Sequence, residues 1–316
     1  MTEAEAHQAS LADAVTVGAY RLGSFAARLL PSPVAQLAAT SLGAGASVTS
    51  IRKRQMIERH LRRVNPSLSG AAMRVAVQQA FDSYARYYVE SFRLPSLSKE
   101  AVDRSFSHEG FHHITDALER GNGCIFALPH LGGWEWAGRW MTDRGHPLTV
   151  VVEALDPPEL FEWFADLRRN LGMHVVPVGP EVGTTVLAAL RRNEIVCLLC
   201  DRDLDRNGVP VEFFGEQTTL PAGPATLAIR TGAAVLPIGV YFTRRVNGHH
   251  AVVRPPLAVE RSGDGLRADV ARITASLARE LEFLIRRAPE QWHLLQPNWP
   301  TDPGWAHGSL PVASAD

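Results

Sequence analysis

The chain has 316 residues, 46% of them hydrophobic and 21% charged, which suits one large globular domain or two smaller ones with a substantial core. The formal net charge of −1 excludes a global electrostatic attraction to nucleic acid. Three cysteines are an odd and small number for this length, so we expect a reducing compartment and no disulfide framework.

The N-terminal region combines a polar start with weakly apolar segments. Residues 1–10, MTEAEAHQAS, are predicted to be disordered, and they lack the cationic start of a secretory signal peptide. Apolar and small residues alternate over residues 12–47, and prolines interrupt the run, which predicts two short amphipathic helices. The longest uncharged stretch, residues 31–50, is too rich in Pro, Gly, Ser and Ala for a confident membrane-spanning helix.

A basic segment, SIRKRQMIERHLRRVNPSLSG, follows at residues 50–70 and carries six arginines and lysines against one acid, Glu58. This charge indicates either a solvated helix face or contact with anionic lipid headgroups, which contributes about 1 kcal/mol per basic residue near such a surface. We therefore expect residues 11–70 to form a helical element that associates with a membrane from its side.

From residue 71 onward the pattern is that of an α/β domain. Residues 71–93 have helical spacing, and apolar runs then alternate with helical segments. The predicted strands are 124–129, 148–152, 174–178, 195–200, 234–242 and 251–253. The predicted helices are 111–120, 133–144, 157–171, 182–192, 221–231 and 266–288. This alternation predicts a single domain over residues 71–300, with a largely parallel central sheet flanked by helices and a flexible tail over 301–316.

The stretch ALPHLGGWEWAG, residues 127–138, joins the first long strand to a helix and contains a titratable pair, His130 and Glu135. On one continuous helix, side chains five positions apart diverge by roughly 140°. Gly132 and Gly133 permit a turn between them, which places His130 at the carboxyl end of a strand and Glu135 in the first turn of a helix. Ligands bind at strand carboxyl ends in open α/β sheets.

A carboxylate on one imidazole nitrogen would fix the tautomer and make the other nitrogen a better base. No serine or cysteine adjoins His130, and the chain contains no G-x-S-x-G motif. The residues therefore indicate either a base that activates a hydroxyl of the substrate for direct attack on an acyl donor, or a structural histidine at a strand end.

The segment HLGGWE fits the first motif of the lysophospholipid acyltransferase superfamily, a histidine and an acid separated by four residues. The chain is most similar to the branch that holds the late lipid A acyltransferases and the phosphatidylinositol mannoside acyltransferases. The resemblance rests, in chain order, on SYARYYVESFRLP (83–95), CDRD (200–203), VEFFGEQTTLPAGPATLAIRTGAAVLPI (211–238) and PEQWHLLQPNW (289–299).

The resemblance implies transfer of a long, palmitoyl-like acyl group from acyl-coenzyme A to a sugar hydroxyl of a membrane glycolipid, with a mannose of a phosphatidylinositol mannoside as the best match. A late acyltransferase of another glycolipid or of a lysophospholipid is the alternative. It implies His130 as general base and Glu135 as its orienting partner. Acyl-coenzyme A would be a co-substrate, with no bound cofactor and no metal. The expected partners are a glycolipid acceptor and an anionic membrane surface, without nucleic acid, and the expected location is cytoplasmic, peripheral on the inner face of the cell membrane.

Five further residues are candidates for substrate binding. Glu153 follows a strand and would bind hydroxyls of the acceptor, or is an exposed loop acid. Arg168 suits a phosphate fork, or is a charge on a helix surface. Asp201 and Arg202 close the strand at 195–200 and would hold a sugar hydroxyl and a phosphate, or form a local ion-pair cluster. By resemblance His293 lines the acceptor site; a structural role is the alternative.

Other patterns have simpler interpretations. Cys197 and Cys200 form a C-x-x-C motif within an apolar strand, which favours buried, inert thiols. The doublet His249 and His250 is predicted at the surface. Two functions of other classes stay open: a metal-dependent hydrolase that uses His130, Glu135 and Asp201, and a non-catalytic lipid-binding protein. The absence of a dense ligand motif such as H-E-x-x-H argues against the hydrolase.

Overall fold

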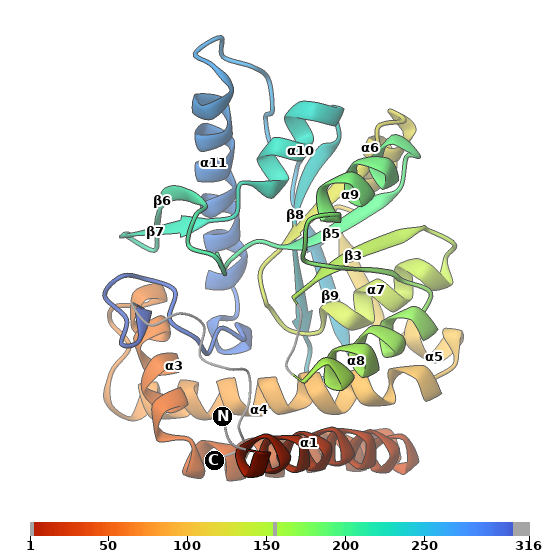
Figure 1. Cartoon of the computed structure of the whole chain (residues 1–316), viewed down its shortest axis with the longest axis vertical. Coiled ribbons are helices and arrows are strands. Elements are labelled where there is room, and N and C mark those ends of the chain that lie inside the picture. The colour runs from red at the N-terminus through yellow and green to blue at the C-terminus, as the bar shows by residue number, and fades with distance from the viewer. Residues whose placement is uncertain (1–2, 154–156, 306–316) are drawn as a thin grey trace.

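The computed structural model describes residues 3–153 and 157–305 (Figure 1). The helices are α1 Glu3–Leu29, α2 Ser32–Thr49, α3 Ile51–Val64, α4 Gly70–Arg93, α5 Lys99–Arg104, α6 His112–Glu119, α7 Trp134–Asp143, α8 Pro158–Asn170, α9 Val182–Arg191, α10 Gly223–Thr231 and α11 Leu266–Arg286. The strands are β1 Phe106–Glu109, β2 Cys124–Leu128, β3 Leu148–Val152, β4 His174–Pro177, β5 Ile195–Leu199, β6 Val209–Phe213, β7 Glu216–Leu220, β8 Ala234–Phe242 and β9 His249–Val253.

Seven strands form one sheet in the order β1-β9-β8-β2-β5-β3-β4, and β6 and β7 form a separate hairpin. All neighbours in the large sheet are parallel except β8 and β9, which run antiparallel. The predicted α/β class with a largely parallel sheet is therefore confirmed. Each predicted strand and helix of the domain is present, whereas the sequence did not indicate β1, α5 or the β6–β7 hairpin.

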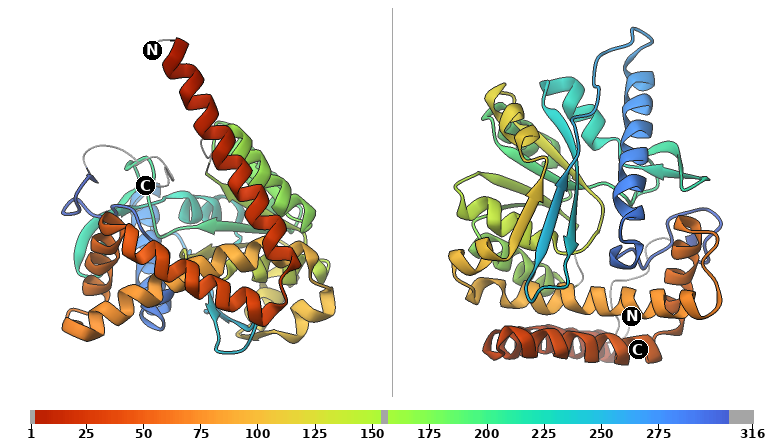
Figure 2. Two further views of the ribbon diagram at one scale, coloured as in Figure 1. Left: turned by 90° about the horizontal axis from the view of Figure 1, so that it is seen from below. Right: turned by 180° about the vertical axis from the view of Figure 1, so that it is seen from behind.

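Strand β2 shows how the sheet separates two apolar layers, because successive side chains of a strand point to opposite faces. Phe126 and Leu128 join the core beneath α7 and α8, with Trp136 among its members. Ile125 and Ala127 join the opposite core, which contains residues of α9, α10 and α11. All five residues of β2 are buried, as expected for a central parallel strand. Helices lie on both sides of the sheet (Figure 2).

The N-terminal helices lie across one end of this sandwich, where α1 and α4 run along the lower edge in Figure 1. They are longer than the two short helices that the sequence predicts, and α1 starts at Glu3, within the stretch predicted to be disordered. A bend at Pro31 separates α1 from α2. Most of the predicted tail, residues 306–316, lies outside the described residues.

Helix α2 buries its small residues and exposes its large ones. Ala35, Ala39, Gly43 and Ser47 are buried, and a Cβ at Gly43 would lie 2.7 Å from the backbone of Asp82 on α4. The opposite surface of α1 and α2 exposes a row of large apolar side chains, which we call the apolar row: Val15, Leu22, Phe25, Leu29, Val34, Leu37, Leu42 and Val48. Among the described residues, no helix is both long and apolar enough to span a membrane.

Candidate active site

The central contact of the site joins two strand ends. His130 follows β2 and Asp201 follows β5, and these strands are neighbours in the sheet. The imidazole Nδ1 of His130 lies 2.7 Å from Oδ1 of Asp201. The His130 side chain is 20% exposed, whereas that of Asp201 is fully buried. Because Nδ1 faces a carboxylate, it carries the proton, and Nε2 is left as the basic nitrogen.

Asp201 is held in its ionised form by several donors. Its Oδ2 accepts hydrogen bonds from the backbone N–H of His130 at 3.0 Å and from Nε1 of Trp292 at 2.7 Å. Burial raises the pKa of Asp201, but the His130 ring and these hydrogen bonds outweigh burial and keep that pKa below its ordinary value. With both oxygens bonded inside the protein, Asp201 has no room for a sugar hydroxyl, so that part of the sequence prediction is wrong.

The predicted contact between Glu135 and His130 is also wrong. Glu135 is buried in the first turn of α7, and its Oε1 accepts hydrogen bonds from Nε of Arg168 at 2.9 Å and from the hydroxyl of Tyr87 at 3.2 Å. Its side chain reaches toward α8 and α4, so the carboxylate on Nδ1 of His130 comes from the neighbouring strand end. The left-handed φ of +60° at Gly132 provides the turn that the sequence predicts.

A pocket of about 260 Å³, the outer pocket, opens in front of His130. Five of the seven predicted site residues line it: His130, Glu153, Arg168, Arg202 and His293. Within its wall, Arg202 donates to Glu153 at 2.5 Å. Asp201 lies behind this wall and is bonded to His130, whereas Glu135, bonded to Arg168, lines a second pocket that adjoins this one. The structure therefore brings the predicted residues together, but in two groups, His130 with Asp201 and Arg168 with Glu135.

His293 is buried, and its Nε2 lies 2.8 Å from the hydroxyl of Ser83 on α4. Burial is the largest of the effects that lower its pKa, to about 3, so the ring is neutral at physiological pH. Its Nδ1 has no hydrogen-bond partner among the described residues. The ring lines the outer pocket, while its unpaired Nδ1 is shielded from solvent and its Nε2 is taken up by Ser83.

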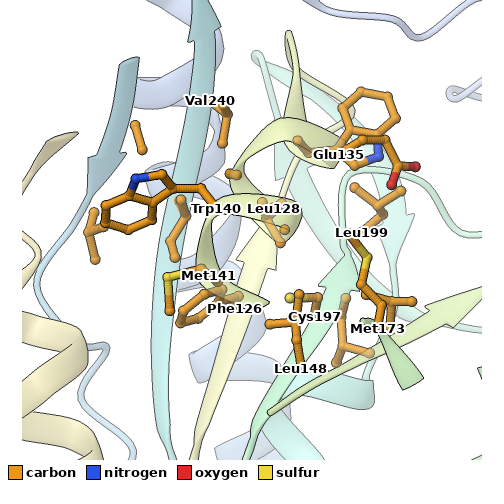
Figure 3. A pocket seen from close by; sticks show the side chains of 18 of the residues that line it. Phe126, Leu128, Glu135, Trp140, Met141, Leu148, Met173, Cys197, Leu199 and Val240 are labelled. Carbon is orange, nitrogen blue, oxygen red and sulfur yellow. The ribbon is translucent and has the colours of Figure 1, made fainter. Parts of the chain in front are cut away.

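A second pocket, the inner pocket, extends beneath α7 and is almost entirely apolar (Figure 3). Its volume is about 90 Å³, and its walls include Phe126, Leu128, Trp140, Met141 and Met173. It adjoins the outer pocket, because both share the following lining residues: Trp134, Val151, Val152, Arg168, Leu198 and Leu199. An apolar channel that starts beside a polar, basic pocket suits an acyl chain with a polar head.

The structure also tests the predictions for the cysteines and for His249. The three cysteines are free; Cys124 and Cys200 are buried, and Cys197 is half-buried in the wall of the inner pocket. His249 is 1% exposed, so its predicted surface position is wrong. Within the part of the chain described, no group of three or more His, Cys, Asp or Glu side chains could hold a metal ion.

Comparison with known proteins gives this arrangement a family. The profile of the bacterial lipid A biosynthesis acyltransferases matches residues 7–301. The chain belongs to that family. It is 42% identical over 228 residues to the phosphatidylinositol mannoside acyltransferase of Mycobacterium tuberculosis strain H37Rv, covering 71% of this chain and 70% of the relative. It is 37% identical over 292 residues to the same-named protein of Mycolicibacterium smegmatis, covering 91% of this chain and 92% of the relative.

Membership of the lipid A acyltransferase family identifies the chain as a glycolipid acyltransferase. Sequence reasoning missed three side chains at the site: Trp292 on Asp201, Tyr87 on Glu135, and Tyr20, which reaches the outer pocket from α1. Trp292 adjoins the candidate His293 in the PEQWHLLQ segment, so its position in the sequence was a signal. Tyr20 gave none, because its place in the wall depends on how α1 crosses α4.

Proposed function

We propose that this acyltransferase moves a long acyl chain from acyl-coenzyme A to a mannose hydroxyl of a phosphatidylinositol mannoside, with His130 as general base. The observation that carries the proposal is the hydrogen bond between Nδ1 of His130 and the buried Asp201 at 2.7 Å. It leaves Nε2 without a partner among the described residues, on a ring that lines the outer pocket. The names of the relatives supply the acceptor.

The chemical step follows from that geometry. Nε2 of His130 takes the proton of the acceptor hydroxyl as its oxygen attacks the thioester carbonyl carbon. Backbone N–H groups in the first turn of α7, which starts at Trp134 beside His130, would stabilise the negative charge on the carbonyl oxygen. The carbon–sulfur bond then breaks, and the coenzyme A thiolate leaves and takes up the proton from the imidazolium. Asp201 stabilises that imidazolium while it exists.

The two pockets divide the substrates between them. The inner pocket would take the acyl chain, since its wall is apolar and it adjoins the outer pocket that His130 lines. In the outer pocket, Arg202 and Arg168 offer guanidinium groups to phosphate, Glu153 can accept hydrogen bonds from sugar hydroxyls, and His293 lines the wall of the acceptor site. This assignment keeps the predicted substrate roles of these four residues and removes Asp201 from the set.

The apolar row on α1 and α2 would place the site at a membrane surface, with α3 and its basic side chains beside it. A glycolipid acceptor stays in the bilayer, so the enzyme must approach it there. We place the enzyme peripherally on the inner face of the cell membrane, where acyl-coenzyme A is available. A peripheral association agrees with the lack of a spanning helix among the described residues.

Incubation with labelled palmitoyl-coenzyme A and mannosylated phosphatidylinositols in vesicles, followed by mass analysis of the lipids, tests the proposal. We expect one added acyl group on a mannose, and loss of nearly all turnover in His130→Ala with the fold intact. His112→Ala, which removes an exposed histidine, is the matched control and should stay active. No acylated product from the unaltered chain, or normal turnover in His130→Ala, would refute the proposal. Vesicle binding without any acyl transfer would indicate a lipid-binding protein instead.

A further inference from the structure

Backbone hydrogen bonds join the segment that carries Trp292 to the loop that carries His130. Gly132 donates its N–H to the carbonyl of Gln291 at 2.9 Å, and His293 donates its N–H to the carbonyl of His130 at 2.7 Å. Leu131 and Trp292 form an antiparallel bridge between these two bonds. The position of the Trp292 backbone relative to His130 is thus fixed from both sides.

The indole ring of Trp292 is fixed as firmly as its backbone. Trp292 is 5% exposed. Its ring lies among aromatic neighbours, with centroids 5.6 Å away at Phe214, 5.7 Å at His60 and 6.3 Å at Trp299. In this position its Nε1 is 2.7 Å from Oδ2 of Asp201. A buried indole N–H needs an acceptor, and the acceptor here is the carboxylate that bonds the candidate base.

We propose that Trp292 is a positioning residue for His130: its indole N–H and the backbone N–H of His130 together hold Oδ2 of Asp201, so that Oδ1 meets Nδ1 of the imidazole. The inference rests on the proposed function, in which that imidazole is the general base. Trp292 itself touches neither reacting atom. Without its N–H, one of the two donors to Oδ2 is lost, and the buried carboxylate is less well stabilised in its charged form.

The consequence for titration has a definite sign. The active form needs neutral His130 and ionised Asp201. Loss of a donor to the carboxylate favours protonation of Asp201, and it also leaves the carboxylate to pair more strongly with an imidazolium. Both effects keep a proton on the pair up to higher pH. The acid limb of the kcat/KM profile should therefore move to higher pH by about one unit in Trp292→Phe.

The neighbours of the pair do not obscure this measurement. Burial lowers the pKa of His293 to about 3 and that of His60, on α3, to about 4. Burial raises the pKa of the Cys200 thiol well above its ordinary value. The other charged side chains near His130 are Arg202 and Arg168 in the wall of the outer pocket, and they are paired with Glu153 and Glu135. These ion pairs are present in every variant compared below, so a difference in the acid limb between the variants reports on the indole N–H.

The test compares Trp292→Phe with Trp299→Phe. Trp299 is the matched control, because it is fully buried in the same aromatic cluster and donates its Nε1–H to the carbonyl of Phe213 at 3.2 Å, away from Asp201. We expect the acid limb to move in Trp292→Phe and to stay in place in Trp299→Phe. If the acid limb of the kcat/KM profile lies at the same pH in both variants, the inference is overturned and Trp292 has a packing role alone.

Two further experiments complete the test: a replacement that keeps the shape of the Trp292 ring, and a titration of His130 that does not depend on enzyme activity. Incorporation of 3-benzothienylalanine at position 292 keeps the ring volume and removes only the N–H; it serves where Trp292→Phe does not fold. ¹⁵N-histidine NMR of the full chain follows the titration of His130 directly. We expect the titration of His130 to move to higher pH in Trp292→Phe and in the 3-benzothienylalanine variant. An unmoved titration in these two variants would refute the inference. If the unaltered chain transfers no acyl group, the proposed function fails, while the NMR result still decides the role of Trp292.

Discussion

His130 and Asp201 occupy equivalent places on neighbouring strands. Leu128 of β2 pairs in register with Leu199 of β5, and each member of the pair is followed two positions later by a residue of the dyad. Parallel strands in register deliver their next residues to the same edge of the sheet. The 2.7 Å contact between imidazole and carboxylate thus follows directly from the register of two buried strands.

Asp201→Asn should reduce kcat by roughly three to four orders of magnitude, as expected when a histidine base is held in the wrong tautomer. The N–H of His130 and the Nε1–H of Trp292 both point at Oδ2, so the amide oxygen of the variant must lie there. Its NH₂ group then faces Nδ1 and forces the proton onto Nε2. Steady-state kinetics measure the loss, and a kcat within tenfold of the unaltered enzyme would contradict it.

Glu135 and Arg168 should behave as one unit in stability measurements. Their buried pair is joined at 2.9 Å and 2.5 Å, so Glu135→Gln or Arg168→Met alone leaves one charge without its partner, at a cost of about 3 kcal/mol or more in the free energy of unfolding. The double variant should lose clearly less than the two single effects combined. Urea unfolding of all four chains measures this, and additive losses would show that the two side chains act independently.

Gly138→Leu should shift the acyl preference toward shorter chains. Gly138 lines the inner pocket from α7, and a Cβ added there would already meet Cε of Met173 at 2.6 Å, so a larger side chain fills space that the acyl chain needs. In Gly138→Leu we expect the ratio of kcat/KM for palmitoyl-coenzyme A to that for decanoyl-coenzyme A to fall by about tenfold or more. The ratio for Gly138→Ala should lie between those of the unaltered chain and Gly138→Leu. An unchanged ratio would show that the chain lies elsewhere.

Leu37→Glu combined with Leu42→Glu should weaken binding to anionic vesicles by about tenfold or more, because two exposed apolar side chains leave the contact and two negative charges enter it. These residues are 69% and 61% exposed on α2. Leu266→Glu is the control, since Leu266 is an exposed leucine at the start of α11 and does not belong to the apolar row. Vesicle sedimentation measures binding. If Leu266→Glu weakens binding as much as the double variant on α2, the apolar row is not the membrane contact.

His60 should make the chain less stable as the pH falls from about 6.5 to about 4. Burial lowers the pKa of His60 from 6.5 to about 4, so the unfolded chain binds a proton in this interval that the folded chain does not. The loss amounts to about 3 kcal/mol in the free energy of unfolding. Its Nε2 lies 2.9 Å from the carbonyl of Gln296, and Arg63 donates to Nδ1, so the ring has no place for a second proton.

His60→Gln should therefore show a flatter dependence of unfolding free energy on pH than the unaltered chain. His112→Gln, at an exposed position on α6, should follow the unaltered chain. Denaturant unfolding at intervals of half a pH unit measures both. The same slope in all three chains would assign the acid sensitivity to other groups.

The sequence predicted the elements of the domain well where the hydrophobic pattern was strong. Strand 148–152 has the predicted bounds, and helix 182–192 ends one residue earlier. The β6–β7 hairpin was missed because its strands carry several polar residues and its turn is unusual. Phe214 and Gly215 form that turn with φ of +53° and +77°, and phenylalanine is not the residue expected at a positive φ.

The sequence predicted most of the residues that form the site, but not which of their side chains contact each other. His130 and Asp201 were both recognised at strand ends, yet only the strand order places β5 beside β2, and chain order does not reveal it. Spacing favoured Glu135 as the partner because it is near in sequence. The direction of its side chain depends on α8 and α4, which contribute Arg168 and Tyr87 from 33 and 48 positions away.

The bridge between residues 291–293 and the loop of His130 also bears on the synthesis of the protein. A nascent chain carries His130 and Asp201 long before it carries Trp292, and domains begin to fold while the ribosome is still adding residues. The dyad therefore stays incompletely supported until position 293 has been translated and released. Chains that stop before that point lack this support, and we expect them to transfer acyl groups more slowly than the full chain.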